Sequence, residues 1–185
     1  MDYDYIVVGA GSGGCAVAGR LARDKDISVL LVEAGGSDRG LTVQAPIAFA
    51  KQFHGKGDWN YYSEAEPGLN GRSVYLPRGK VIGGSSSMNA MLWVLGARED
   101  FDGWDVPGGA WEDCAPVFRR MEDHFLGGPH GVGGPVHVRV SSNPDPVTRL
   151  FVESAKRVIG NDNTDIGGPD LEGCEPSPVT VDGGR

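Results

Sequence analysis

A glycine-rich stretch near the start of the chain has the residue types and spacing of a phosphate-binding turn. Gly9, Gly11 and Gly14 form a GxGxxG pattern within the segment GAGSGG. The first glycine permits a tight turn, the second lets a pyrophosphate approach the backbone, and the third lets a helix pack closely on a strand. The N–H groups at the start of that helix then face the phosphates. The pattern predicts a dinucleotide-binding turn, which also includes Ser12 and Gly13.

A carboxylate follows where an adenosine ribose would lie. Glu33 ends the second apolar run of the chain. At the end of a second strand, a carboxylate can accept hydrogen bonds from both ribose hydroxyls, and it would repel a 2′-phosphate. We therefore expect FAD or NAD and not NADP. The pattern does not separate the first two, because both contain the same ADP half.

A βαβ unit is needed to position these residues. Residues 3–8 and 27–32 are short apolar runs typical of strands buried on both faces, and residues 15–23 have small and apolar residues at helical spacing. Strand, glycine turn, helix and strand together form the βαβ unit of a parallel sheet. The predicted fold class is α/β.

Further elements are predicted along the rest of the chain. Helices are expected at residues 46–53, 86–95, 111–125 and 147–159, and strands at residues 73–76, 136–140 and 178–181. We expect Pro116 in the first turn of its helix, where a missing N–H is tolerated. Residues 35–72 are irregular, and so long a loop is typically functional. The glycine-rich connector LGGPHGVGGP, at residues 126–135, indicates a domain boundary.

The charge composition argues against two classes of binding partner. The formal net charge of −8 argues against nucleic acid, which needs clustered basic residues, and against a membrane surface. Cys15, Cys114 and Cys174 are odd in number and widely spaced, which indicates neither a disulfide framework nor a metal knuckle. The N-terminal residues lack the pattern of a signal peptide. We expect a reduced, cytoplasmic setting.

The histidines give no metal-binding pattern in the sequence. There are four of them: His54, His124, His130 and His137. They are scattered without the spacing of metal ligands, and we interpret them as surface or connector residues. No metal is expected. The serines at positions 85–87 lack the GxSxG context of a hydrolase nucleophile.

A second glycine-rich segment lies in the middle of the chain. Residues 78–91 read RGKVIGGSSSMNAM, so two adjacent glycines, three serines and an asparagine lead directly into the apolar run MLWVL. Because such a run has to be buried, the polar groups beside it need partners inside the protein. A buried helix with a capping serine would account for the serines but not for the paired glycines.

The segment GKVIGGSSSMNAMLWVLGAREDFD resembles the first signature of the glucose-methanol-choline (GMC) oxidoreductases, flavoenzymes that mostly oxidise alcohols. The stretches LLVEAGG, DWNY, LPRGKVIGG, FDGW and HGVGGPVHV are similar to the same family, and only residues 140–180 are weakly supported. The resemblance implies a Rossmann-like FAD-binding domain with a parallel sheet in residues 1–128, including a loop or lid at 35–72. Residues 129–185 would begin an α+β substrate domain, and the fold is expected to be incomplete in this chain.

The resemblance also implies the cofactor and its contacts. Gly83 and Gly84 would let the backbone approach the ribityl chain and pyrophosphate of FAD, while Ser85 and Asn89 would bond polar flavin atoms. Met88 stands where some members carry a histidine joined to the flavin, so FAD is expected to bind non-covalently. The full set of expected cofactor-binding residues is Gly9, Gly11, Ser12, Gly13, Gly14, Glu33, Ala34, Trp59, Arg78, Gly79, Val81, Gly83, Gly84, Ser85, Asn89, Ala90, Met91 and Leu92.

The activity implied is that of a flavin-dependent alcohol oxidase or dehydrogenase that moves hydride from a primary alcohol carbon to flavin N5. The catalytic histidine of the family lies near the C-terminus of a much longer chain. We therefore expect no catalytic residue here and an inactive chain by itself. The expected partners are the rest of the same polypeptide, or a second chain, and a small-molecule alcohol. Two alternatives stay open: a lyase or decarboxylase of the family that keeps FAD without alcohol oxidation, and a non-catalytic NAD-binding Rossmann module.

Overall fold

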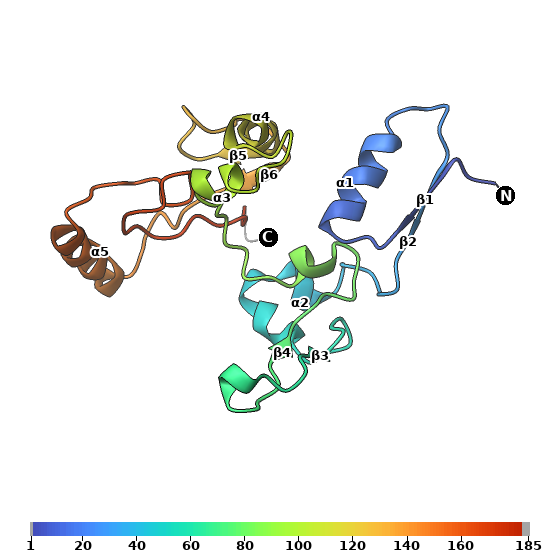
Figure 1. Ribbon diagram of the computed structural model, residues 1–185, viewed down its shortest axis with the longest axis horizontal. Helices are drawn as coiled ribbons and strands as arrows, with labels where there is room; N and C mark the ends of the chain where they lie inside the picture. The colour runs from blue at the N-terminus through green and yellow to red at the C-terminus, as the bar shows by residue number, and fades with distance from the viewer. Residues whose placement is uncertain (1, 183–185) are drawn as a thin grey trace. The chain divides into compact units, whose positions relative to one another are not determined.

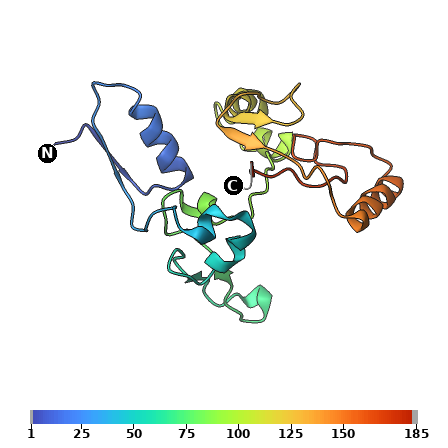
Figure 2. The same ribbon diagram turned by 180° about the vertical axis from the view of Figure 1, so that it is seen from behind.

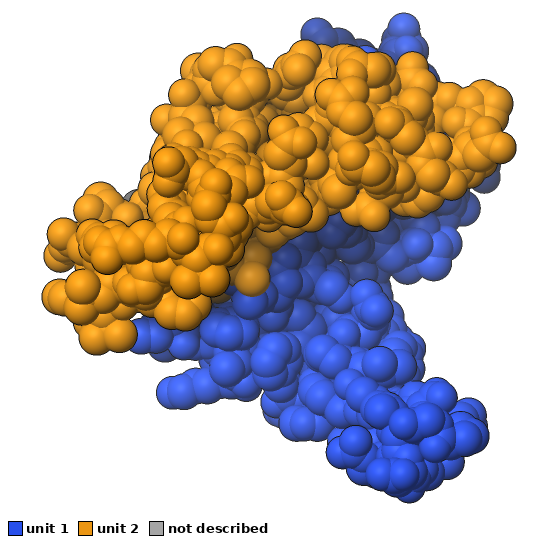
Figure 3. Space-filling model, turned by 60° about the vertical axis from the view of Figure 1, so that its left-hand side comes forward, with its two compact units in different colours: residues 1–90, 185 blue, residues 91–184 orange. Residues whose placement is uncertain are grey.

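The computed structural model describes residues 2–182, which divide into two compact units, residues 2–90 and 91–182 (Figure 3). The predicted boundary near residue 128 concerns domains of a longer protein and stays a prediction.

The first unit begins with the predicted βαβ arrangement. Strand β1 (Tyr5–Val8), helix α1 (Ser12–Leu21) and strand β2 (Val29–Val32) follow one another, and the strands pair in parallel with Tyr5 opposite Val29. Helix α1 lies along this pair of strands (Figures 1 and 2). The parallel pair and its crossover helix confirm the predicted α/β class.

The sequence pattern predicted strands that are buried on both faces, and this prediction is wrong. In β1, Ile6 is 62% exposed and Val8 is 83% exposed. Within residues 2–182 the sheet has only these two strands, so α1 covers part of the pair and the other surfaces stay open.

Residues 35–90 contain only short elements, and those within residues 35–72 lie where a long irregular loop was expected. These elements are α2 (Leu41–Gln44), η1 (Pro46–Gln52), β3 (Tyr61–Tyr62), η2 (Pro67–Leu69), β4 (Tyr75–Leu76) and η3 (Gly84–Ser87). The predicted helix at 46–53 is the 3₁₀ helix η1, with proline in its first turn. The predicted strand at 73–76 is β4, which pairs antiparallel with β3.

The predicted buried helix over residues 86–95 is wrong. Only the 3₁₀ turn η3 forms, and Met91 adopts a left-handed backbone with φ of +59°. The hydroxyl of Ser86 donates to the Gly83 carbonyl oxygen, and that of Ser87 donates to the Ile82 carbonyl oxygen. Serine side chains that bond nearby carbonyls in this way offer the backbone an alternative to the helical ladder.

The second unit contains α3 (Arg98–Asp102), α4 (Trp111–Met121), β5 (Glu122–His124), β6 (Val136–Val138) and α5 (Pro146–Ile159). Strands β5 and β6 pair in parallel. Asp145 accepts a hydrogen bond from the Val147 N–H at 2.8 Å, which caps the start of α5. Gly160, at φ of +69°, ends that helix in the left-handed conformation that glycine favours.

Helix α4 differs from its prediction in two respects. It ends at Met121 and not at residue 125, because Glu122 takes an extended conformation and joins β5. Pro116 lies inside the helix and not in its first turn. The apolar face of α4 still forms the core of the unit, where Trp111 and Ala115 are buried and Phe118 packs against Phe101 with ring centroids 5.7 Å apart.

The predicted late strand at 178–181 is reduced to isolated bridges. Val179 pairs with Leu92 on one side and with Arg139 on the other. The three cysteines are unpaired. Within residues 2–182, none of the helices combines the length and apolar character that crossing a membrane demands.

Candidate cofactor-binding site

The first glycine loop connects β1 to α1, and two of its positions favour glycine for different reasons. Gly9 has a φ of +95°, a conformation that side chains disfavour. A Cβ atom on Gly14 would lie 1.9 Å from the Gly9 carbonyl oxygen. The third glycine of the pattern therefore lets α1 approach the end of β1 closely.

The start of α1 offers an open backbone surface. Gly11 is the N-cap residue, no side chain caps the helix, and no acidic residue lies in its first turn. A Cβ atom on Gly11 or Gly13 would meet nothing within 4 Å. Helix N-termini attract anions through their N–H groups and the helix dipole. This open, uncapped terminus fits the pyrophosphate of a dinucleotide.

The second glycine segment pairs directly with the first. Gly83 forms a parallel bridge with Gly11, and its N–H donates to the Ala10 carbonyl oxygen at 2.7 Å. A Cβ atom on Gly84 would lie 2.8 Å from the Gly11 Cα, and Gly84 has a φ of +59°. Two segments that are distant in the sequence thus form one glycine-lined backbone surface.

Serine hydroxyls reinforce this pairing. Ser12 donates from Oγ to the Ser86 hydroxyl oxygen at 3.0 Å. The Ser85 hydroxyl oxygen accepts the Gly79 N–H at 3.1 Å. A Cβ atom on Gly79 would lie 2.2 Å from the Gly84 carbonyl oxygen, so this third glycine also permits a close backbone approach.

Glu33 holds the loop in a way that the sequence analysis did not foresee. Its Oε2 accepts the Ala10 N–H at 2.7 Å, and its Oε1 accepts the Gly35 N–H at 2.8 Å. The carboxylate thereby ties the glycine loop to the end of β2. Each carboxylate oxygen has a further lone pair, so the predicted contact with ribose hydroxyls remains chemically possible and stays a prediction.

Asp58 is a second anchoring residue that the sequence analysis missed. It is 5% exposed and accepts hydrogen bonds from the Tyr75 hydroxyl and from the N–H groups of His54, Asn60 and Arg78. Burial alone would raise the pKa of Asp58, but the bond from Tyr75 and these three backbone bonds outweigh it and lower the pKa to about 2. The sequence contained one signal for this role, the carboxylate of Asp58 directly before an aromatic residue in the DWNY motif.

Asp58 positions the residues on both sides of it. Trp59 donates its N–H to the Arg78 carbonyl oxygen at 2.9 Å, while the Arg78 N–H binds Asp58. Trp59 is 38% exposed, and the Lys80 ammonium lies 4.6 Å from the centroid of its ring. Val81, the next predicted site residue, is buried and forms a bridge with Gly36.

Replacing Asp58 by asparagine should remove a pH-dependent part of the stability. Because the pKa of Asp58 in the folded protein lies below its ordinary value of 3.8, the ionised carboxylate stabilises the fold above pH 4. This contribution, about 1–2 kcal/mol, is lost as the pH falls from about 4 to about 2. Urea unfolding of the wild type over this pH range should show the loss, and Asp58→Asn should show a flatter profile.

Asp26→Asn is the matched control, since Asp26 is exposed and its carboxylate makes no hydrogen bond among the described residues. The free energy of unfolding of Asp26→Asn should depend on pH in the same way as that of the wild type. An unchanged profile in Asp58→Asn would contradict the role of this carboxylate.

The remaining predicted contacts are distributed over both units. Ala34, Asn89 and Ala90 are exposed residues of the first unit. Met91 and Leu92 belong to the second unit, where the Met91 carbonyl accepts the Thr180 N–H at 2.8 Å and Leu92 bridges Val179. The structure therefore brings the two glycine segments together. A shared site that also includes Met91 and Leu92 stays a prediction.

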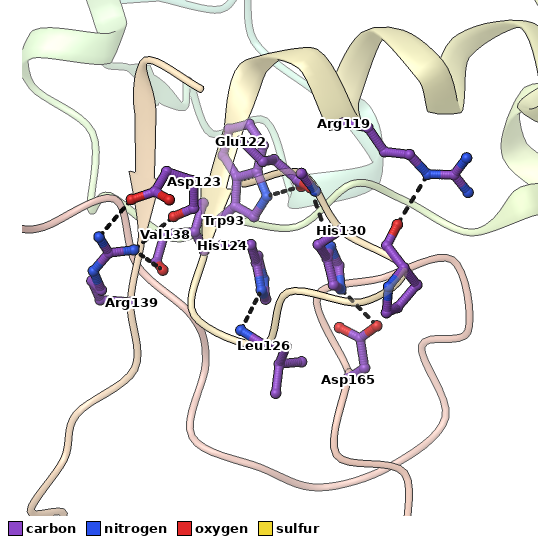
Figure 4. A network of polar contacts seen from close by, with 12 residues as sticks. Trp93, Arg119, Glu122, Asp123, His124, Leu126, His130, Val138, Arg139 and Asp165 are labelled. Carbon is purple, nitrogen blue, oxygen red and sulfur yellow. Dashed lines mark hydrogen bonds and ion pairs between the residues drawn. The ribbon is translucent and has the colours of Figure 1, made fainter. Parts of the chain in front are cut away.

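The interpretation of the histidines as surface or connector residues is wrong for His124, which lies in β5, and it did not foresee that His130 of the connector is buried. His124 is 4% exposed and His130 is 8% exposed, and their rings stack with centroids 3.7 Å apart (Figure 4). Asp165 comes close to both, although it lies far along the chain. Sequence spacing did not reveal this cluster because the fold assembles it from separate segments.

Comparison with known proteins agrees with this geometry. The family model described as GMC oxidoreductase matches residues 3–176. Oxygen-dependent choline dehydrogenase from Rhizobium etli is 43% identical over 192 residues, covering 100% of this chain and 35% of that protein. The chain thus spans about a third of the length of the curated relatives it matches.

Solved structures give the same result. Pyridoxine 4-oxidase from Mesorbium loti superposes with a TM-score of 0.92 at 35% identity, over 100% of this chain and 38% of that one. Formate oxidase superposes with a TM-score of 0.81 at 27% identity, over 97% of this chain and 34% of that one.

The βαβ unit and its glycine-lined surface define a dinucleotide-binding protein of the Rossmann class. Because the family model covers nearly the whole chain, the chain belongs to the GMC oxidoreductase family, and the predicted resemblance is confirmed. Membership implies a flavin cofactor, which argues against NAD as the bound dinucleotide.

Proposed function

We propose that this chain is the FAD-binding part of a flavin-dependent alcohol oxidase or dehydrogenase. The observation that carries the proposal is the bridge between Gly11 and Gly83, which joins the dinucleotide-binding turn to the GMC signature segment. When bound, the flavin supplies a hydride acceptor for oxidation of an alcohol carbon. The residues of this chain bind and orient that cofactor.

Each part of the site has a role in this proposal. The uncapped start of α1, with Gly11 and Gly13, receives the pyrophosphate. Glu33 accepts hydrogen bonds from the ribose of the adenosine, while its bonds to Ala10 and Gly35 hold it in place. Gly83, Gly84 and Ser85 form the second side, and residues 89–92 contact the flavin.

The catalytic base and most of the substrate pocket are proposed to come from the rest of a longer polypeptide. Two matched proteins bear the names choline dehydrogenase and pyridoxine 4-oxidase, which supports a primary alcohol as the substrate class. A third match is a formate oxidase, so a family member without an alcohol substrate is the competing function.

FAD should be released by acid from the natural polypeptide that carries this chain. Met88 is 3% exposed and cannot form the covalent link that a histidine at this position makes in some members. The purified protein should be yellow, and acid precipitation should leave a colourless pellet and FAD in the supernatant. Colour that stays in the pellet would contradict non-covalent binding, and a colourless native protein would contradict flavin binding.

Anaerobic addition of a primary alcohol tests the reaction in the same sample. Choline, pyridoxine and a simple aryl alcohol should be tried in turn, with formate as the comparison. Bleaching of the flavin absorbance by at least one alcohol is expected. Bleaching by formate alone, or by none of the compounds, would count against alcohol oxidation while leaving the flavin assignment intact.

A further inference from the structure

A polar cluster in the second unit lies outside the proposed flavin site. A ring nitrogen of His124, a ring nitrogen of His130 and a carboxylate oxygen of Asp165 lie within 4.8 Å of one another (Figure 4). His124 ends β5, His130 follows in the glycine-rich connector, and Asp165 comes from the segment after α5. Both imidazole side chains are buried.

Glu122 orients the ring of His130. This carboxylate is 1% exposed, and it accepts the Trp93 indole N–H at 2.9 Å and the Gly131 N–H at 3.1 Å. His130 Nδ1 lies 3.2 Å from Glu122 Oε2, so Nδ1 carries a proton and donates it to this fixed acceptor. A buried carboxylate bound to one nitrogen of a histidine is the usual support for metal binding by the other nitrogen.

The second nitrogen of His130 therefore faces Asp165 with a lone pair unless it is protonated. His130 Nε2 lies 2.8 Å from Asp165 Oδ2. A nitrogen lone pair and a carboxylate oxygen repel each other at this distance, and a positive charge between them removes the repulsion. That charge is either a proton held between the two atoms or a metal ion.

His124 adds an independent observation. Its Nδ1 accepts the Leu126 N–H at 3.2 Å, while its buried Nε2 has no hydrogen-bond partner among residues 2–182. Buried polar atoms without hydrogen-bond partners are rare, so the Nε2 atom of His124 indicates a ligand bound nearby.

We propose that His124, His130 and Asp165 bind a divalent transition-metal ion, for which zinc is the best match. Two imidazoles and one carboxylate are a common zinc ligand set that leaves a fourth position for water or another ligand. A cavity of about 170 Å³ adjoins the cluster and is lined by His124, Asp165, Thr164 and Glu175, among others. It provides room for the fourth ligand.

Two local adjustments accompany binding. Zinc lies about 2.0–2.2 Å from such ligands, so ligand atoms of a tetrahedral site are about 3.3 Å apart. The contact between His130 and Asp165 has to lengthen by about half an ångström. The two rings stack at an interplanar angle of 8°, so His124 has to turn for both lone pairs to meet one ion. The turn has to break the 3.2 Å hydrogen bond from the Leu126 N–H and the stacking on the Phe125 ring, whose centroid lies 4.8 Å away.

Zinc binding to the natural polypeptide, loaded with flavin, tests the proposal. The protein is first dialysed against a chelator, and uptake of Zn²⁺ is then measured by equilibrium dialysis with elemental analysis. One ion per chain is expected in the wild type. Asp165→Asn and His124→Gln should each weaken binding at least about tenfold, because each removes a ligand. Far-ultraviolet circular dichroism checks that the variants are folded.

His137→Asn is the matched control. His137 lies in β6 of the same unit, its side chain is 50% exposed, and its Nδ1 lies 3.0 Å from Asp123. It should bind zinc as the wild type does. If His124→Gln fails to fold, the zinc affinity of Asp165→Asn still tests the proposal. The Asp165 side chain lies at the edge of the cluster and is 28% exposed, so its replacement should disturb the fold less. Absence of bound zinc in the wild type, or equal affinity in Asp165→Asn, would overturn the proposal and leave a proton between His130 and Asp165 as the bridging charge.

Discussion

Gly14→Ala should destabilise the protein more than any other single methyl group added to the glycine loop. The new Cβ would lie 1.9 Å from the Gly9 carbonyl oxygen, and backbone atoms cannot move aside as a flexible side chain can. Helix α1 would have to shift away from β1, which we expect to cost about 3 kcal/mol. Guanidinium unfolding of the natural polypeptide should show a lower midpoint with an unchanged slope. Bound FAD should fall in parallel, because the same shift opens the proposed pyrophosphate site.

Gly13→Ala provides the control within the same turn of α1. A Cβ at this position meets nothing within 4 Å, and alanine is favoured over glycine inside a helix by about 0.5–1 kcal/mol. Its unfolding midpoint, measured without FAD, should equal or exceed that of the wild type. Equal destabilisation by the two substitutions would contradict the close contact between Gly14 and Gly9.

Glu33→Gln should weaken FAD binding about a hundredfold. The carboxylate of Glu33 accepts two backbone N–H bonds, and an amide has only one oxygen with which to accept them. A hydrogen bond to a charged group contributes about 1.5–3 kcal/mol, and a loss of about 3 kcal/mol is a hundredfold change in affinity. The Ala10 or Gly35 N–H would lose its partner, and the loop that carries the phosphate-binding glycines would be less well held. Fluorescence titration of the apoprotein with FAD measures the effect.

Glu64→Gln is a suitable comparison, because Glu64 is exposed and no hydrogen bond of its carboxylate occurs among the described residues. FAD affinity within about twofold of the wild type is expected for this control. An equally small change in Glu33→Gln would show that neither the loop nor the ribose depends on the carboxylate.

The local elements of the first unit could be predicted because they depend on residues close together in the chain. Gly9 allows the positive φ of the turn, small residues follow it at helical spacing, and apolar runs flank both. The capping of α5 by Asp145 is equally local. The prediction of a helix at residues 86–95 was wrong. It rested on the apolar content of this segment, but the hydroxyls of Ser86 and Ser87 donate hydrogen bonds to carbonyl oxygens of preceding residues.

The histidine cluster shows what sequence spacing cannot convey. His124 falls within the predicted helix 111–125, His130 falls within the connector, and Asp165 comes from the segment after α5. The buried carboxylate of Glu122 looked like a residue of the helix 111–125, but it lies in β5 and faces His130. Burial and the orientation of a ring nitrogen depend on these long-range contacts.

By itself, the sequence determined the βαβ unit, the glycine positions and the membership of the GMC family, because backbone conformation and signature residues are properties of short segments. Only the tertiary structure decided that Gly83 pairs with Gly11, that Glu33 and Asp58 act as anchors, and that His124, His130 and Asp165 meet. These contacts join residues that are distant in the chain. Their formation depends on the packing of whole segments, which no local pattern specifies.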